Sequence, residues 1–200
     1  EIAGLNRDGK AAVSSETESL LENALVLCER TDGALDITVY PVVRAWGFTT
    51  GEYQVPDEID LVDALALVDY HKVKLDRGTA SLSPGMQIDL GSVAKGWTGD
   101  KVLKMFRKRG VESALLNLGG NVQALGSKPD GSSWRVGIRS PSEDGYAGAV
   151  EISYKAVITS GGYQRFFEEN GNRYHHIIDP KTGWPASNGL RSEEHTSELQ

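Results

Sequence analysis

The sequence predicts an α+β protein, a single domain in which mixed and antiparallel sheets pack against helices. Helical periodicity is concentrated in the first 110 residues, and short apolar or alternating runs follow it. The helical and strand patterns do not alternate strictly, as a doubly wound sheet would require. The chain of 200 residues is 39% apolar and 24% charged, which is enough to bury a core and is not typical of disorder.

Three segments carry the helical patterns. Residues 15–30 open with a capping box, S-x-x-E, and their apolar residues recur at i, i+4 and i+8. Residues 56–68 begin with Pro-Asp and carry a second apolar stripe, and residues 92–109 form a third helix that ends at Gly110. Residues 34–48 show no regular period, so we expect irregular structure there.

The strand patterns begin with a β-hairpin over residues 73–82, whose turn is Arg77-Gly78-Thr79. Residues 87–90 continue as a short strand that ends before Gly91. The other expected strands are short and are separated by glycine-rich turns. They cover residues 113–118, 122–125, 134–138, 149–154, 156–160 and 174–178.

The composition excludes several classes of protein. The formal charge of −7, from 21 basic and 28 acidic residues, argues against nucleic acid as a partner, because phosphate contacts need a basic face. The sequence has no run of about 18 apolar residues that would span a membrane. Cys28 is the single cysteine, so the chain has neither a disulfide framework nor a cysteine zinc site. The 23 glycines exceed the usual share of about 7%, which indicates turns with positive φ or close approach of the backbone to a ligand.

Both ends of the chain are unusual. The chain begins at Glu1 rather than Met, so a signal peptide could have preceded it. Residues 191–200 have no apolar periodicity and look like the in-frame translation of a sequencing adapter. We therefore expect the genuine domain to be residues 1–190 of a longer protein, and we leave residues 191–200, with His195, outside the fold. Residues 1–190 carry 20 basic and 25 acidic residues, a charge of −5.

One segment carries an anion-binding pattern, Asp89-Leu-Gly-Ser-Val-Ala-Lys95-Gly96. An acid ends a strand, glycine makes a turn, and a helix begins whose free N–H groups and positive dipole end suit a phosphate. Lys95 adds a cation in the first part of this helix, and Asp89 suits a metal ion or a heterocycle N–H. The residues alone slightly favour a plainer interpretation, a cap-like Asp89 and a solvated Lys95. Neither a Walker P-loop nor a G-x-G-x-x-G fingerprint is present.

Three further segments carry polar residues next to strands or turns. Residues 114–121 join a strand to a double glycine, for which a tight hairpin turn is the stronger interpretation. His175 and His176 point to opposite faces of a strand, so at most one enters a given site, and the Asp-Pro-Lys-Thr-Gly that follows is typical of a turn. Asp36 lies among apolar residues, where a carboxylate needs a partner or hydrogen bonds. A Ser/His/Asp triad is set aside, because the sequence has no G-x-S-x-G elbow.

Six segments occur in an order that is specific, although each is modest alone. They are Gly33–Phe48, Ile88–Gly96, Leu116–Gly120, Trp134–Ile138, Thr159–Gly161 and His176–Gly183. In this order they resemble the FAD:protein FMN transferase family, the ApbE-type flavin transferases, over nearly all of residues 1–190. The resemblance implies an α+β fold with a flavin cleft. It also implies an enzyme that uses Mg²⁺ to move FMN from FAD to a Thr or Ser hydroxyl of an acceptor protein, with release of AMP.

The resemblance assigns roles to individual residues. It makes His176 the candidate catalytic residue and places Ser92 at the metal ion. It also implies a set of contacts with the flavin cofactor, in which Asp89 and Lys95 meet FAD. The cofactor-binding residues are Ala34, Leu35, Asp36, Asp89, Lys95 and Ile178.

The resemblance also implies partners and a location. Acceptors in the family are subunits of redox-driven ion pumps and related electron-transfer proteins. The enzymes lie outside the cytoplasmic membrane, often as lipoproteins, so we expect a periplasmic or outer-face location with membrane contact only through a lost N-terminal anchor. Two alternatives stay open: a Mg²⁺-dependent FAD pyrophosphatase that gives FMN and AMP, and a non-catalytic flavin-binding lipoprotein.

The chain departs from the family pattern at one point. In the family, further metal ligands follow the H-x-x-D-P motif in a D-x-x-[DAT]-T-like stretch, and this sequence has no such stretch before Leu190. We therefore expect this chain to bind FAD weakly and to transfer FMN poorly or not at all. Robust metal-dependent transfer would contradict that expectation.

Overall fold

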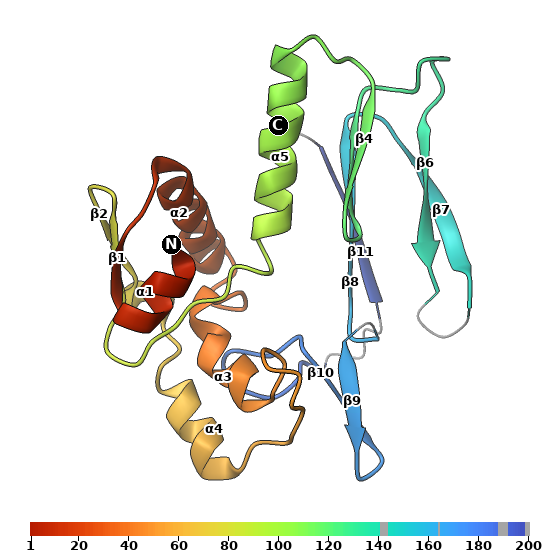
Figure 1. The fold of residues 1–200 in the computed structure, drawn as a ribbon. Helices are drawn as coiled ribbons and strands as arrows, with labels where there is room; N and C mark the ends of the chain where they lie inside the picture. Colours follow the sequence, from red (N-terminus) through yellow and green to blue (C-terminus); the bar gives the residue numbers. More distant parts are fainter. Residues whose placement is uncertain (141–143, 164, 188–191, 199–200) are drawn as a thin grey trace. The chain divides into compact units, whose positions relative to one another are not determined.

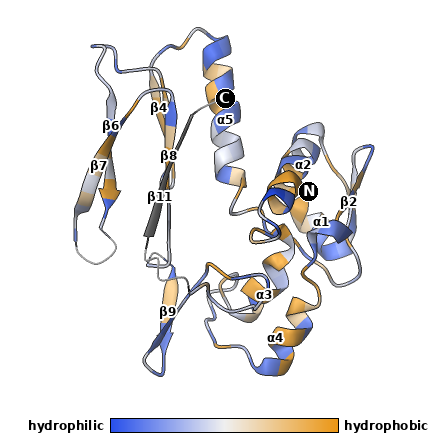
Figure 2. Ribbon diagram, turned by 180° about the vertical axis from the view of Figure 1, so that it is seen from behind, coloured by the Kyte–Doolittle hydropathy of each residue, from blue (hydrophilic) through white to orange (hydrophobic). Residues whose placement is uncertain are grey.

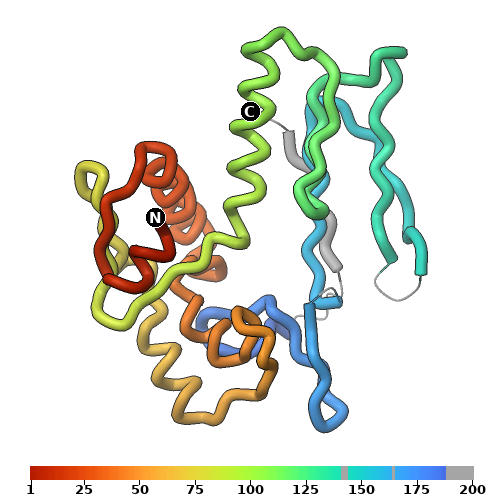
Figure 3. Tube along the Cα trace, viewed as in Figure 1, coloured from red at the N-terminus to blue at the C-terminus, as the bar shows by residue number. Residues whose placement is uncertain are grey.

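The computed structural model describes residues 1–140, 144–163, 165–187 and 192–198 (Figure 1). Its helices and small antiparallel sheets confirm the predicted α+β class. The chain divides into two compact units. Unit 1 comprises residues 1–92 and 165–187, and unit 2 comprises residues 93–164 and 188–200. The chain therefore runs through unit 1, builds unit 2, and returns to unit 1 at residue 165 (Figure 3).

The N-terminal part of unit 1 combines two helices with a three-stranded sheet. Its elements are α1 (Ile2–Asp8), β1 (Lys10–Ala12), α2 (Ser15–Arg30), β2 (Lys74–Asp76) and β3 (Thr79–Ser81). The strands pair antiparallel in the order β1-β3-β2, so the predicted hairpin is confirmed and gains β1 as a third strand. Figure 3 shows the red N-terminal segment beside the yellow segment that carries this hairpin.

Helix α2 has the predicted bounds, but its N-cap residue is not the Ser15 of the predicted capping box. The N-cap is Ser14, whose side chain accepts a hydrogen bond from the backbone N–H of Thr17 at 3.3 Å. The Glu18 carboxylate, which we expected in a capping box with Ser15, instead accepts from the backbone N–H of Gly78 at 3.0 Å. The predicted capping box is therefore wrong, and Glu18 ties α2 to the turn of the hairpin.

Cys28 lies on the buried face of α2 and has no exposed surface. Burial raises the pKa of its thiol, so the reactive thiolate is scarce at neutral pH. We expect iodoacetamide to leave Cys28 unmodified in the folded protein and to alkylate it in concentrated urea, as intact mass will show. Rapid alkylation without denaturant would contradict this packing.

A second group of elements in unit 1 surrounds Trp46. They are η1 (Ile37–Val39), α3 (Tyr40–Ala45), α4 (Glu58–Leu65), η2 (Tyr70–Lys72), β9 (Phe166–Glu169) and β10 (Asn172–His175). The expectation of irregular structure over residues 34–48 is wrong, because η1 and α3 lie there. Asp36 caps η1 through its side chain, and Pro41 stands in the first turn of α3, so both helices begin on residues suited to that position.

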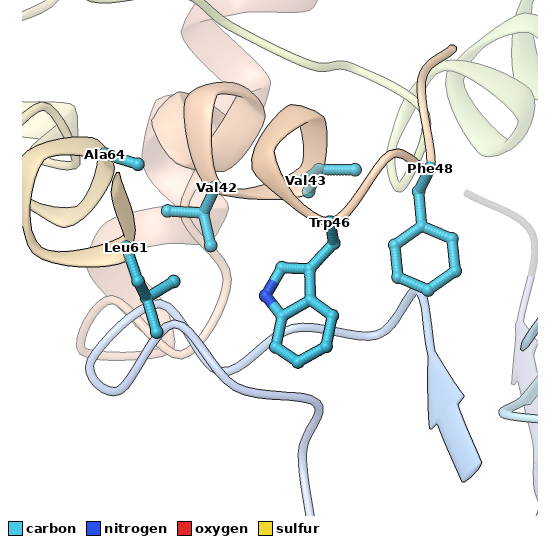
Figure 4. Close-up of a cluster of buried hydrophobic side chains, with 6 residues drawn as sticks. All are labelled: Val42, Val43, Trp46, Phe48, Leu61 and Ala64. Carbon is cyan, nitrogen blue, oxygen red and sulfur yellow. The ribbon is translucent and has the colours of Figure 1, made fainter. Parts of the chain in front are cut away.

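The core of this group is a cluster of six buried side chains. They are Val42, Val43, Trp46, Phe48, Leu61 and Ala64 (Figure 4). Figure 2 shows the hydrophobic residues of α3 and α4 that supply it. The indole Nε1 of Trp46 donates to the carbonyl oxygen of Gly183 at 2.8 Å, and the rings of Tyr174 and Trp184 each lie 5.2 Å from the Trp46 ring. Residues of the segment 165–187, which returns from unit 2, therefore pack onto the core supplied by α3 and α4.

In the described residues, unit 2 holds a long helix, a four-stranded sheet and a two-stranded sheet. The helix is α5 (Ala94–Lys108), and the strands are β4 (Ala114–Leu118), β5 (Asn121–Leu125), β6 (Trp134–Arg139), β7 (Tyr146–Ile152), β8 (Lys155–Gly161) and β11 (Ser192–Glu198). The sheets have the orders β11-β8-β5-β4 and β6-β7, and every pair is antiparallel. Helix α5 contacts β4 and β5. Gly99 permits the close approach, because a Cβ there would overlap the side chain of Gln123.

Two expected strands differ in the structure. Residues 87–90 belong to no strand, so that prediction is wrong. The strand expected over residues 174–178 ends at His175, although Ile178 forms an isolated antiparallel bridge with Pro185. No helix of the described residues has both the length and the apolar character needed to cross a membrane.

The backbone of Ser192–Glu198 forms β11, although we left residues 191–200 outside the fold. This strand pairs antiparallel with β8. An unpaired strand edge offers backbone N–H and C=O groups to any extended segment, so pairing does not require an apolar period. The boundaries at residues 1–190 and 191–200 stay a prediction.

Candidate functional site

The segment that carries Asp89 is held in place by contacts with distant parts of unit 1. Ile88 is buried, and its N–H and C=O groups both bond to the side chain of Asn6 in α1. The backbone N–H of Asp89 donates to the carbonyl oxygen of Ile37 at 2.7 Å. The Asp89 carboxylate accepts from the N–H of Gly91 at 2.6 Å, which forms an Asx turn. Asp89 does not cap α5, whose N-cap is Val93 without a side-chain hydrogen bond.

A cavity of about 530 Å³ opens on unit 1 beside this segment. It is lined by α1, by Tyr40 and by residues 87–90, and Asp89 is one of its charged side chains. Arg7 of α1 is another, and it pairs with Asp8 at 2.8 Å on the surface. The volume lies in the range of sites for small molecules, about 300–1,000 Å³. Asp89 is therefore a predicted site residue that the structure places on the wall of a cavity.

The carboxylate of Asp36 is hydrogen-bonded to other residues of unit 1. Its Oδ1 accepts from the N–H and the hydroxyl of Thr38 at 2.7 and 2.6 Å, and its Oδ2 accepts from the N–H of Tyr70 at 3.2 Å. The residue is only 8% exposed. These three hydrogen bonds supply what a buried carboxylate needs, and they join η1 to η2.

Ala34 and Leu35 lie in the turn that follows α2. The N–H of Ala34 donates to the carbonyl oxygen of Thr31 at 3.0 Å, and the N–H of Leu35 donates to the Thr31 hydroxyl at 3.1 Å. Ala34 is exposed and Leu35 is half-buried. The bond from the N–H of Asp89 reaches Ile37, two residues after Leu35.

Ser92 and Lys95 flank the start of α5. Both residues are exposed. Ser92 ends the first stretch of unit 1, whereas Lys95 belongs to unit 2, where its Nζ donates to the carbonyl oxygen of Gly119 at 3.4 Å. Gly119 and Gly120 join β4 to β5 with φ of 58° and 90°, which confirms the hairpin turn predicted for residues 114–121.

His176 follows β10 and faces the residue that begins the returning segment. Its backbone N–H donates to the carbonyl oxygen of Arg165 at 3.2 Å, and its ring Nδ1 lies 3.2 Å from the same oxygen. The ring also meets Phe48 edge-on, with centroids 6.3 Å apart. A carbonyl oxygen only accepts hydrogen bonds, so Nδ1 carries the proton in this contact.

The residues after His176 form a structural turn. Asp179 accepts from the N–H of Lys181 through its carboxylate at 2.9 Å and from the N–H of Gly183 through its carbonyl at 2.8 Å. This confirms the predicted turn over Asp-Pro-Lys-Thr-Gly. Ile178 is half-buried and packs against the cluster around Trp46. The described structure therefore gives Ile178 a packing role in unit 1.

Sequence reasoning missed the contribution of α1 to the cavity. The helix has seven residues, and Leu5 is its buried apolar residue, so the sequence shows no amphipathic period that would predict it. The available signal is Gly9, which ends the helix in the left-handed region at φ 70°. Asn6 and Arg7 of α1 entered none of the motifs in the sequence.

Comparison with known proteins covers most of the chain. The model of the ApbE family matches residues 1–193. The chain is 39% identical over 185 residues to the FAD:protein FMN transferase of Klebsiella pneumoniae (strain 342), covering 90% of this chain and 57% of that protein. It is 38% identical over 212 residues to the FAD:protein FMN transferase of Treponema pallidum (strain Nichols), covering 96% of this chain and 59% of that protein.

Solved structures give the same result. The ApbE protein from Thermotoga maritima superposes with a TM-score of 0.92 at 33% identity, covering 98% of this chain and 66% of that one. The flavin transferase ApbE from Vibrio cholerae superposes with a TM-score of 0.85 at 31% identity, covering 99% of this chain and 65% of that one. The chain thus spans somewhat more than half the length of these curated relatives. On its sequence and its fold, this chain belongs to the ApbE family.

Proposed function

We propose that this protein transfers FMN from FAD to a Thr or Ser hydroxyl of an acceptor flavoprotein, in a Mg²⁺-dependent reaction that releases AMP. The observation that carries the proposal is the place of Asp89 on the wall of the cavity in unit 1. The motif around Asp89 is the one that the family resemblance assigns to FAD. The relatives named FAD:protein FMN transferase, at 38–39% identity, support the same activity.

The proposed reaction is a phosphoryl transfer. The acceptor hydroxyl oxygen attacks the FMN-side phosphorus of FAD, and a phosphoester bond forms. The bond between that phosphorus and the bridging oxygen breaks, and AMP leaves with the bridging oxygen. The hydroxyl proton must pass to a base. We propose His176 for this role, because the Arg165 carbonyl engages its ring at Nδ1 and so orients the imidazole.

The proposed cofactor-binding residues offer three kinds of contact: apolar, backbone and cationic. Ala34, Leu35 and Ile178 would offer apolar contacts to the flavin. Asp36 has its carboxylate bonded within the fold, so its contact would come from the backbone. Lys95 supplies a cation for the pyrophosphate, at the first turn of a 15-residue helix.

The described residues do not by themselves form a magnesium site. Among them, no group of three or more His, Cys, Asp or Glu side chains lies together as a metal site requires. Mg²⁺ in nucleotide enzymes keeps several waters and takes one or two protein ligands plus substrate phosphates. The proposal therefore gives Ser92 to the ion and leaves most of its coordination to water and FAD. Bound Mg²⁺ would neutralise charge on the pyrophosphate.

The partner and the location follow from the family resemblance and are part of the proposal. We propose as acceptor a subunit of a redox-driven ion pump or a related electron-transfer protein. We place the enzyme outside the cytoplasmic membrane, in the periplasm or on the outer face, held there as a lipoprotein.

The activity is tested by incubating the full-length enzyme with FAD, Mg²⁺ and an acceptor domain, with the Klebsiella relative as a positive control. We expect FMN on the acceptor by intact mass, with AMP in solution, and loss of both when EDTA is added. Free FMN and AMP without an adduct would show a pyrophosphatase instead. FAD that is bound but unchanged would show a binding protein.

Asp89→Ala is expected to weaken FAD binding about tenfold, since a charge-assisted hydrogen bond contributes about 1.5–3 kcal/mol and about 1.4 kcal/mol is tenfold. Asp89→Asn is the matched variant: it keeps an oxygen that can accept from the N–H of Gly91 and loses only the charge. Fluorescence titration with FAD measures both, and we expect the asparagine variant to lie between wild type and alanine. Equal affinity in all three proteins would show that Asp89 does not contact FAD.

A further inference from the structure

The side-chain amide of Asn6 takes the place of a strand partner for Ile88. Its Nδ2 donates to the carbonyl oxygen of Ile88 at 2.9 Å, and the N–H of Ile88 donates to its Oδ1 at 2.8 Å, across 82 positions of sequence. This is the pair of hydrogen bonds that a residue on a neighbouring antiparallel strand would supply. The Asn6 amide therefore holds Ile88 although residues 87–90 belong to no strand.

The contacts on either side of Ile88 strengthen this clamp. The Gln87 side chain donates to the backbone carbonyl of Asn6 at 3.3 Å, and the N–H of Asp89 donates to the carbonyl of Ile37 at 2.7 Å. The segment is thus fixed to α1 at Ile88 and to η1 at the next residue. Asn6 and Asp89 both line the cavity, so the clamp and the predicted site residue share one cavity wall.

We propose that Asn6 is a positioning residue for Asp89. It fixes the Asp89 segment at Ile88, so that Asp89 stands at the cavity wall before FAD arrives. Both ends of its amide are engaged by Ile88, so Asn6 acts through the backbone of this segment. The inference rests on the proposed function in one respect, that the ligand of Asp89 is FAD.

A double-mutant cycle tests this role. Asn6→Ala is expected to weaken FAD binding about tenfold, as Asp89→Ala does, because a misplaced carboxylate contributes little. In the Asp89→Ala background, Asn6→Ala is expected to cost less than a further twofold, since the group it positions is already absent. A residue that only stabilised unit 1 would weaken binding by the same factor in both backgrounds, and that result would overturn the proposal.

Two further variants and one measurement without ligand keep the test sharp. Asn6→Asp keeps the acceptor for the Ile88 N–H and loses the donor to its carbonyl, so an intermediate affinity is expected if Asn6→Ala folds poorly. Asn23→Ala removes an amide that donates to Ser19 on the exposed side of α2, and it should leave FAD affinity unchanged. Amide hydrogen exchange at Ile88 and Asp89 should accelerate in Asn6→Ala without FAD, and unchanged exchange would refute the clamp.

Wild-type protein with no affinity for FAD would overturn the proposed function, whereas normal affinity in a folded Asn6→Ala would overturn this inference alone.

Discussion

Gly47→Ala is expected to lower the free energy of unfolding by about 3–5 kcal/mol, the range of severe backbone and overpacking defects. Gly47 separates the buried Trp46 and Phe48, and its φ of 77° lies in the left-handed region. A Cβ at this position would overlap the backbone carbonyl of Glu52 and would lie 2.9 Å from the Cα of Tyr53. Because the obstructing atoms are backbone, the loop cannot yield by rotating a side chain.

The neighbouring Gly51 provides a matched control. Its φ is 83°, and nothing lies within 4 Å of a Cβ added there. Gly51→Ala should therefore cost only the left-handed conformation, about 1 kcal/mol. Urea unfolding followed by tryptophan fluorescence gives both values, and alkylation of Cys28 reports the opening of unit 1 independently. Equal destabilisation by the two variants would show that the contact with Glu52 does not constrain the loop.

The parts of the fold that the sequence predicts well are governed by local signals. Helix α2 has the expected bounds because a polar cap, a regular apolar stripe and a stop at Thr31-Asp32-Gly33 occur together. The β2–β3 turn has positive φ at both Arg77 and Gly78, and glycine at a turn is visible in the sequence. In each case the residues that decide the structure lie within a few positions of one another.

The parts that the sequence did not predict depend on distant residues. Residues 34–48 fold into η1 and α3 around Trp46, whose hydrogen-bond partner Gly183 lies 137 positions away. No local pattern shows that partner. Residues 87–90 have the apolar character of a strand, but their partner is the side chain of Asn6, which no strand pattern can reveal.

The candidate site likewise combines features that local sequence predicts with features that depend on distant residues. The family motifs identified Asp89, and the structure places it at a cavity, but the wall of that cavity formed by α1 was not foreseen. Asp36 was singled out because its apolar surroundings require partners. The structure supplies them from Thr38 and from Tyr70, and the second of these is 34 positions away. A sequence can therefore indicate that a buried carboxylate needs donors without indicating where they come from.

His176→Ala is expected to lower the rate of FMN transfer at saturating FAD about 100-fold, the lower end of the usual contribution of a general base. The Arg165 carbonyl holds Nδ1 as the donor and orients the ring, so removing the imidazole takes away a base that is already in the right tautomer. The affinity for FAD should change less than threefold, because the proposed role concerns the acceptor proton rather than the cofactor. Radiolabelled FAD in single-turnover reactions makes slow transfer measurable.

His175→Ala is the control that the chain itself offers. His175 is the last residue of β10, and its Nδ1 is buried without a hydrogen-bond partner in the described part of the chain. Adjacent residues of an extended segment face opposite sides, so this variant removes the same ring from the other face and should keep the transfer rate within a few-fold. Added imidazole should partly restore transfer by His176→Ala and should leave His175→Ala unchanged, because only the first variant lacks the base.

If His176→Ala transfers FMN as fast as wild type, or loses rate only in proportion to FAD affinity, the base must be another group. A carboxylate near the pyrophosphate would then be the next candidate, and Asp89 is the one that the cavity already holds.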